Sequence, residues 1–272
     1  MHLSSKKLNI VVLFFLFSLN VLSQEYKRII SLAPSLTQSL YHLNSHDKLV
    51  GCTSYCEIAR DDNKEIIASA IKVNLEALLK LNPDLVIATT ITNPETIEYI
   101  QKFGIKTEIF SSPKSFSEIC DQFNRIGKLI GKEDLALTIT EKTGKTVDSL
   151  KNSIKLKTHP KVFFQIGANP IFTVLPNTFM DDYISFIGGT NIASDLNKGT
   201  ITREFVITQN PDIIIITTMG ITGDEEKQIW ESYSSLNATK NKQIIVVDSN
   251  IACTPNPISF AETLKSIVHS IK

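Results

Sequence analysis

The chain has 272 residues, in which 28 Lys and Arg are balanced by 28 Asp and Glu and 42% of residues are hydrophobic. This balance excludes a strongly basic protein that holds nucleic acid through its phosphates, because that binding requires an excess of cationic side chains. The length and the hydrophobic content are those of a globular protein with one large or two modest domains.

Residues 1–23 have the pattern of a secretory signal peptide. Lys6 and Lys7 precede an unbroken apolar run, Ile10–Phe17, and a short cleavage region ends at Ser23. The run is too short to span a bilayer well, which requires about 20 apolar residues, so an uncleaved anchor is the less favoured alternative. We expect a periplasmic protein that is cleaved near Ser23 and, because no cysteine stands near that point, carries no lipid anchor. The mature chain then has 26 basic and 28 acidic residues.

Residues 24–131 are predicted to form an N-terminal α/β lobe, because short apolar strands alternate with amphipathic helices. The strands are expected at Lys27–Ala33, Lys48–Cys52, Asp84–Thr89 and Lys106–Phe110. The helices are expected at Leu36–Leu43, Asn93–Phe103 and Ser115–Ile130, with a further short helix before Asn82. The polar segment Thr53–Lys64 is expected to be a loop that exposes Tyr55 and Cys56.

Residues 132–158 are predicted to form one long connecting helix. Over Glu133–Lys157, apolar side chains recur with helical spacing and make a single stripe, formed by Leu135, Ile139, Val147, Leu150 and Ile154. Such a helix would run roughly 38 Å, about the width of a small domain.

Residues 159–272 are predicted to form a C-terminal lobe with the same plan. Its strands are expected at Lys161–Ile166, Asp212–Thr217 and Gln243–Asp248, and its helices at Thr178–Ile187, Thr202–Gln209, Asp224–Ser232 and Ser259–Ile271. The strand Asp212–Thr217 is apolar on both faces, which is typical of a parallel sheet covered by helices on both sides. We therefore expect an α/β fold in which two doubly wound parallel-sheet lobes are joined by a single long α-helix.

Two segments on either side of the connecting helix repeat each other. Asn74–Thr90 and Thr202–Thr218 align without a gap at an offset of 128 residues. Each reads as a short helix, an Asn-Pro-Asp break and a buried strand. Glu76 and Glu204 occupy equivalent positions ahead of these breaks. The repeat supports two similar lobes.

Five phrases occur in order along the chain: RIISLAPSLTQSLY, KLVGCTSYC, NLEALLKLNPDLVI, GGTNIA and TREFVITQNPDIIII. In order and spacing they resemble the helical-backbone periplasmic binding proteins. These proteins are the substrate-binding components of ABC importers for cobalamin, haem and iron–siderophore complexes. The resemblance covers nearly all of residues 27–272.

The resemblance implies a binding protein whose two lobes face each other across a cleft at the carboxyl ends of their strands, with the long helix as a stiff hinge. It implies a metal-chelate ligand (a corrinoid, haem or a ferric siderophore), no cofactor besides that ligand, and delivery to an ABC permease–ATPase complex by a monomer. An enzyme is not expected, because the sequence has no G-x-S-x-G, G-x-G-x-x-G or P-loop motif. The alternatives are a binding protein for a bare metal ion held by Cys thiolates and a ligand sensor without a transport role.

Glu76 and Glu204 stand where the family carries one acidic residue per lobe that pairs with permease arginines. The repeat gives independent support, since a two-fold permease requires two equivalent carboxylates. The alternative is that each glutamate is part of the solvated surface of a short helix. With the repeat and the resemblance together, we favour docking.

Tyr55 falls in the loop where cobalamin binders of this family place an aromatic residue, and Phe172 has a similar position in the second lobe. An aromatic face packs against a corrin, porphyrin or catechol at low entropic cost. Ordinary loop packing is the alternative, and for Phe172 the two are evenly balanced. Where cobalamin binders tend to have tryptophans, this chain has Ala70, Thr89 and Lys198, which departs from the usual cobalamin pocket.

Cys52 and Cys56 bracket Tyr55, and Cys253 follows the last strand at the same edge of the fold. Three thiols could hold a soft metal ion or ligate the metal of a chelate, so Cys52, Cys56 and Cys253 are candidate metal ligands and Cys56 and Cys253 candidate ligand contacts. A disulfide or simple burial is the favoured alternative in an oxidising compartment. Cys120, on an apolar helix face, is expected to serve packing. The histidines lack ligand spacing, which disfavours a zinc or manganese binder.

Overall fold

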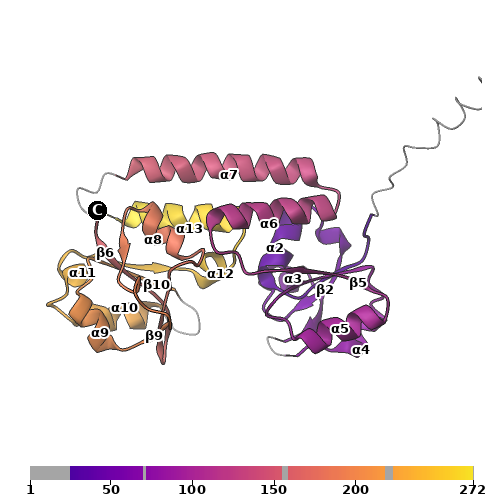
Figure 1. The fold of residues 1–272 in the computed structure, drawn as a ribbon, viewed down its shortest axis with the longest axis horizontal. Helices are drawn as coiled ribbons and strands as arrows, with labels where there is room; N and C mark the ends of the chain where they lie inside the picture. The colour runs from indigo at the N-terminus through magenta and orange to yellow at the C-terminus, as the bar shows by residue number, and fades with distance from the viewer. Residues whose placement is uncertain (1–24, 70–71, 155–158, 218–222, 272) are drawn as a thin grey trace, which may run out of the picture.

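The computed structural model of the chain describes residues 25–69, 72–154, 159–217 and 223–271. The predicted signal peptide, residues 1–23, lies outside this part of the chain. Two α/β lobes lie side by side, and the long helix α7 (Glu133–Ser153) runs along the same end of both (Figure 1). Within the described ranges, no helix is both long enough and apolar enough to cross a membrane.

The N-terminal lobe is built on a parallel sheet with the strand order β3-β2-β1-β4-β5. Its strands are β1 (Ile29–Ser31), β2 (Leu49–Thr53), β3 (Glu65–Ala68), β4 (Leu85–Thr89) and β5 (Lys106–Phe110). Its helices are α2 (Pro34–His42), the 3-10 helix η1 (His46–Lys48), α3 (Glu57–Asp61), α4 (Leu75–Lys80), α5 (Pro94–Lys102) and α6 (Phe116–Leu129). The central strand β1 is buried throughout, because helices cover both faces of the sheet.

The C-terminal lobe has a mixed sheet with the order β11-β10-β6-β7-β9, and β8 also pairs with β6. Its strands are β6 (Lys161–Ala168), β7 (Ile171–Thr173), β8 (Thr190–Asn191), β9 (Thr200–Ile201), β10 (Ile213–Thr217) and β11 (Ile244–Val247). Its helices are α8 (Asp181–Phe186), α9 (Arg203–Gln209), α10 (Gly223–Glu231), α11 (Asn237–Lys240), α12 (Ser249–Ala252) and α13 (Pro257–Ser270). The predicted architecture of two α/β lobes is confirmed, and the antiparallel strand β7 is an addition to it.

The long helix α7 belongs to the cores of both lobes. Its residue Ala136 packs in the N-terminal core with Phe123, and Val147 packs in the C-terminal core with Phe260. The helix begins at Glu133 as predicted and ends before Ile154, which is extended, so it stops short of the predicted end. Residues 155–158 lie outside the described part. One continuous helix seated in two cores makes a stiff connection.

Direct hydrogen bonds also join the two lobes. Asp182 in α8 accepts a bond of 2.6 Å from the backbone N–H of Phe116, the first residue of α6. Asn256, the N-cap of α13, donates through its amide nitrogen to the side-chain oxygen of Gln38 in α2 at 2.8 Å. Burial raises the pKa of Asp182, and the Phe116 N–H acts in the opposite direction. These bonds connect the two lobes in addition to α7.

The two repeat copies begin and end their helices in the same way. Asn74 and Thr202 are the N-caps of α4 and α9, and each side chain accepts the backbone N–H three residues further on. Asn82 and Asn210 follow these helices with φ of 46° and 49°, in the left-handed region that Asn tolerates better than most residues. The proline after each Asn prevents the helix from continuing.

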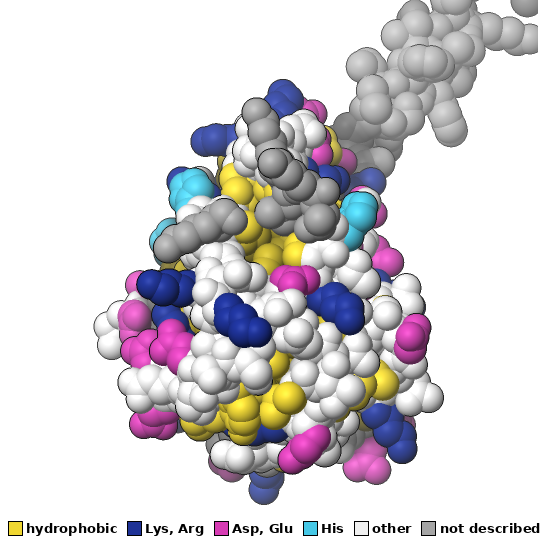
Figure 2. Space-filling view, turned by 90° about the vertical axis from the view of Figure 1, so that its left-hand side faces the viewer, with side chains coloured by type: hydrophobic (Ala, Val, Ile, Leu, Met, Phe, Trp, Pro, Cys, Tyr) yellow, Lys and Arg dark blue, Asp and Glu magenta, His cyan; other side chains and the backbone are white. Residues whose placement is uncertain are grey.

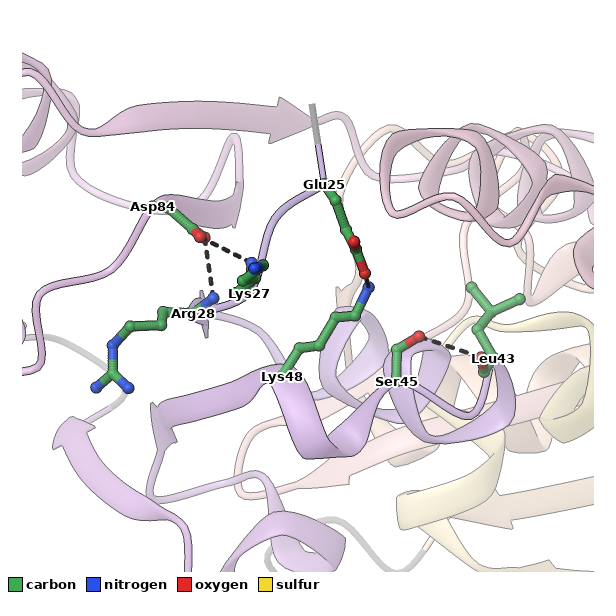
Figure 3. A network of polar contacts seen from close by, with 7 residues as sticks. All are labelled: Glu25, Lys27, Arg28, Leu43, Ser45, Lys48 and Asp84. Carbon is green, nitrogen blue, oxygen red and sulfur yellow. Dashed lines mark hydrogen bonds and ion pairs between the residues drawn. The ribbon is translucent and has the colours of Figure 1, made fainter. Parts of the chain in front are cut away.

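The aspartate of each Asn-Pro-Asp break fastens the first strand of its own lobe. Asp84 accepts hydrogen bonds from the backbone N–H groups of Lys27 at 2.7 Å and Arg28 at 3.0 Å (Figure 3). Asp212 accepts a bond of 2.9 Å from the backbone N–H of Lys161. The sequence repeat is therefore a structural repeat that ties a helix, a turn and two strands together in each lobe.

The predicted loop Thr53–Lys64 differs from the structure, because it contains the short helix α3. The strand β3 follows it at the edge of the sheet and was not expected. Glu65 and Ile66 of this strand are exposed, so it lacks the continuous apolar run that identifies a buried strand.

Candidate ligand-binding cleft

A cleft of about 790 Å³ lies between the two lobes. Thr53, Ala68 and Thr89, the last residues of β2, β3 and β4, all line it. The C-terminal lobe contributes Phe179, Cys253, Thr254 and Pro255. The cleft is therefore at the carboxyl edge of the N-terminal sheet, which is where open parallel sheets bind ligands.

Lys72 is the only charged side chain among the described residues that line the cleft. The other polar lining residues offer hydroxyl or amide groups, as Ser35, Ser112 and Gln122 do. The helices α2 and α5 both begin at the cleft, and the N-terminus of a helix carries a partial positive charge. The cleft thus combines one cationic side chain and two helix N-termini with many hydrogen-bonding groups.

Tyr55 lines the cleft and is 61% exposed, and its contact with a ligand stays a prediction. It stands in a turn after β2, where its backbone N–H donates to the Thr53 hydroxyl at 3.3 Å. A ring held out from a short turn can pack against a ligand with little loss of entropy. Phe179 comes from the other lobe and supplies a second aromatic residue to the lining.

Phe172 is not among the residues that line this cleft. It stands on β7, is 42% exposed, and its ring lies against the backbone of Gly167 and Gly199. A Cβ at Gly167 would approach Phe172 to 3.2 Å, so this position favours glycine. A contact between Phe172 and ligand remains a prediction.

The cysteines separate into a buried pair and a cleft residue. Cys52 and Cys56 are 0% and 1% exposed, so the expectation that the loop exposes Cys56 is wrong. Cys56 is the N-cap of α3, and its thiol turns inward to the hydroxyls of Thr37 and Thr53. Cys253 lines the cleft, where burial raises the pKa of its thiol to about 11. The Cys253 thiol is therefore neutral at physiological pH.

The three-cysteine metal site is not formed. No group of three or more Cys, His, Asp or Glu side chains in the described part of the chain is placed to hold a metal ion. Cys52, Cys56 and Cys253 all belong to that part. Cys120 is partly buried, and burial raises its pKa to about 12, in keeping with a packing role.

Glu76 and Glu204 are both exposed at the second position of α4 and α9. These helices lie at the ends of the lobes opposite α7 (Figure 1). The pKa of Glu204 is lowered by hydrogen bonding from its own backbone N–H and from the Thr202 hydroxyl. Its carboxylate is therefore charged at neutral pH. Neither glutamate lines the cleft.

Several cleft residues were not found from the sequence. Ser111 and Ser112 directly follow the predicted strand Lys106–Phe110, so the rule that ligands bind at strand ends would have found them. Lys72 follows β3, which was itself not predicted. No motif in the sequence marks Phe179 as a cleft residue. It reaches the cleft only through the tertiary fold.

The sequence profile of the periplasmic binding protein family matches residues 29–251. The chain belongs to this family. The match spans α7 and most of both lobes, which confirms the resemblance drawn from the five phrases. Members of the family are substrate-binding proteins of transport systems and not enzymes, as expected.

Curated relatives and solved structures agree with the family. An uncharacterized ABC transporter substrate-binding lipoprotein of Bacillus subtilis, YvrC, is 29% identical over 92% of this chain and 81% of its own length. A vitamin B12-binding protein of Yersinia pestis is 27% identical over 76% of this chain and 75% of its own. A possible iron-binding periplasmic solute-binding protein of Staphylococcus epidermidis, of known structure, is 29% identical with a TM-score of 0.78, covering 91% of this chain and 99% of that one. The haem-binding protein HutB of Vibrio cholerae, at 19% identity, TM-score 0.78, and coverage of 89% and 97%, shares the fold.

Proposed function

We propose that this protein captures a metal chelate in the interlobe cleft and delivers it to an ABC permease. The observation that carries the proposal is the cleft of about 790 Å³ with walls from both lobes. Its volume suits a ligand of several hundred daltons, because small-molecule sites generally occupy about 300–1,000 Å³. The relatives named for vitamin B12, haem and iron give independent support.

The lining favours an anionic, oxygen-rich chelate such as a ferric siderophore over a corrinoid or haem. Lys72 and the helix N-termini attract negative charge, and the hydroxyl groups offer hydrogen bonds to oxygen atoms. Broad apolar walls would suit a macrocycle better, but Tyr55 and Phe179 are the only aromatic residues of the described lining. Thr89, which stands where cobalamin binders tend to have tryptophan, lines the cleft with a small polar side chain. Lys198 is exposed outside the lining, and Ala70 lies outside the described residues.

We also propose that the protein acts outside the cytoplasm and meets its permease through Glu76 and Glu204. Support comes from the predicted leader, from the lipoprotein relative, and from the matching positions of the two glutamates in the repeat. On the side of the C-terminal lobe that faces away from the N-terminal lobe, both signs of charge are interspersed (Figure 2). Single carboxylates at fixed positions, and not a broad acidic surface, would then set the docking register.

Lys72→Met is expected to weaken binding of an anionic probe, the ferric complex of citrate, by about tenfold or more, because a charge-assisted hydrogen bond contributes about 1.5–3 kcal/mol. Lys198→Met removes the same charge from an exposed position outside the cleft and is expected to leave affinity unchanged. Calorimetric titration of both variants tests the ligand class. Equal affinities in the two variants, or tighter binding of cyanocobalamin than of any anionic chelate, would contradict it.

A further inference from the structure

The turn that carries Tyr55 has a cysteine at each end. The backbone N–H of Cys56 donates to the Thr53 carbonyl at 3.0 Å and closes the turn. Cys52 belongs to the end of β2, and Cys56 caps the start of α3. Anything that links these two residues therefore fixes the turn at its base.

The two thiols meet in the interior of the N-terminal lobe. Cys52 and Cys56 are 0% and 1% exposed, and their side chains influence each other's pKa. Both belong to the core cluster that contains Leu36 and Phe110. Neither thiol lines the cleft, so ligand binding does not account for the pair.

The surroundings of Cys56 differ from those of Cys52 in a way that favours a thiolate. The Cys56 sulfur is 3.1 Å from the Thr37 hydroxyl and 3.2 Å from the Thr53 hydroxyl. The Thr53 oxygen accepts the Tyr55 N–H, so its own proton is available to the sulfur. Hydrogen bonding, first from Cys52 and then from these hydroxyls, lowers the pKa of Cys56, although burial acts in the opposite direction. The same Cys52–Cys56 bond, followed by burial, raises the pKa of Cys52.

We propose that Cys52 and Cys56 are a dithiol that closes to a disulfide in an oxidising compartment and thereby locks the turn that presents Tyr55 to the cleft. The assignment rests on the burial of both thiols in one core, on the hydroxyl groups around Cys56, and on the closed turn between them. It does not depend on which ligand the cleft binds.

The reaction is thiol–disulfide exchange with a low-molecular-weight disulfide such as oxidised glutathione. The Cys56 thiolate attacks one sulfur of that disulfide, a mixed disulfide forms, and the other half leaves as a thiolate. Cys52 then loses its proton and attacks the Cys56 sulfur, which releases the second half as a thiol. Two protein thiols have given up two protons and two electrons, and one disulfide has become two thiols. Because both sulfurs are buried, the turn must open for the first attack.

The test is an alkylation count on the full chain after equilibration with oxidised glutathione. The protein is denatured and alkylated without reductant, then digested and analysed by mass spectrometry. We expect label on Cys120 and Cys253 only, and a peptide containing Cys52 and Cys56 that is about 2 Da lighter than its reduced form. Labelling of all four cysteines, a glutathione adduct that persists on Cys56, or a bond from Cys52 or Cys56 to Cys253 would overturn the proposal.

Two variants separate the roles of the thiols. Cys52→Ser removes the second attacking thiol, so the glutathione adduct on Cys56 should accumulate, whereas Cys120→Ser should leave closure unchanged. Hydrogen exchange of the wild type tests the locking, with amides of residues 53–56 expected to exchange more slowly in the oxidised form than in the reduced form. Equal exchange rates would refute the locking even if the disulfide forms.

Discussion

The double variant Glu76→Ala, Glu204→Ala is expected to bind ligand as tightly as the wild type while losing most of its affinity for the permease. Both carboxylates are exposed at the ends of the lobes, outside the cleft. Truncating one partner of a desolvated charge pair costs about 2 kcal/mol or more, a factor of about 30 in affinity for each glutamate. Affinity for the permease–ATPase complex in nanodiscs and stimulation of its ATPase activity provide the two measurements.

The matched control removes two acids from the opposite side of the molecule. Glu141 and Asp148 are exposed on α7, so their replacement by alanine changes the net charge equally without touching α4 or α9. We expect this control to dock normally. If it loses affinity as strongly as the Glu76 and Glu204 variant, net charge governs docking and the two-carboxylate proposal is wrong.

Trp230→Ala is expected to destabilise the protein by about 3–5 kcal/mol, because it leaves a cavity where a large, fully buried side chain was packed. The indole packs edge-on against Phe163 at 5.6 Å between ring centroids and lies under the Arg203 guanidinium at 4.7 Å. Its N–H donates to the Gln165 side-chain oxygen at 2.7 Å. One residue of α10 thus holds together β6 and the helix α9 that carries Glu204. Urea unfolding followed by circular dichroism measures the loss, since the variant has no tryptophan left for fluorescence.

Trp230→Phe separates the packing of the ring from its hydrogen bond. It keeps most of the apolar volume and leaves Gln165 without its donor, a change worth about 1–3 kcal/mol. Phe103→Ala, at a position that is 53% exposed, serves as the surface control with an expected change of about 0.5 kcal/mol or less. If Trp230→Ala unfolds at the same urea concentration as Phe103→Ala, the buried network does not stabilise the lobe.

The parts of the fold that were predictable are those in which pattern and burial agree. β10 has isoleucine at four successive positions and is buried throughout, so its apolar run could be read directly. The stripe on α7 likewise predicted its start at Glu133. The elements that were missed, among them β3, β7 and α3, are short. Their conformation is set by pairing and turn contacts, which leave little periodic signal.

The cleft was harder to predict, because a sequence position gives no direction to its side chain. Tyr55 and Cys56 are neighbours in the sequence, yet the Tyr55 side chain is exposed and the Cys56 thiol is buried against Thr37. Lys72, the charged residue of the described lining, was missed because it follows strand β3, which was itself not predicted. The matching helix caps and Asn-Pro-Asp turns of the repeat are, by contrast, local in sequence and could be recognised there.

The central claim is that the interlobe cleft binds one metal chelate, and calorimetric titration of the purified protein tests it most directly. Ferric citrate, a ferric hydroxamate siderophore, haem, cyanocobalamin and Zn²⁺ are titrated separately. We expect one-to-one binding of at least one chelate with a sub-micromolar Kd, which corresponds to a binding free energy of about −8 kcal/mol or stronger. If the ligand is anionic, Lys72→Met should bind it at least about tenfold more weakly than the wild type does. Heat from Zn²⁺ alone, with no response to any of the four chelates, would contradict the claim.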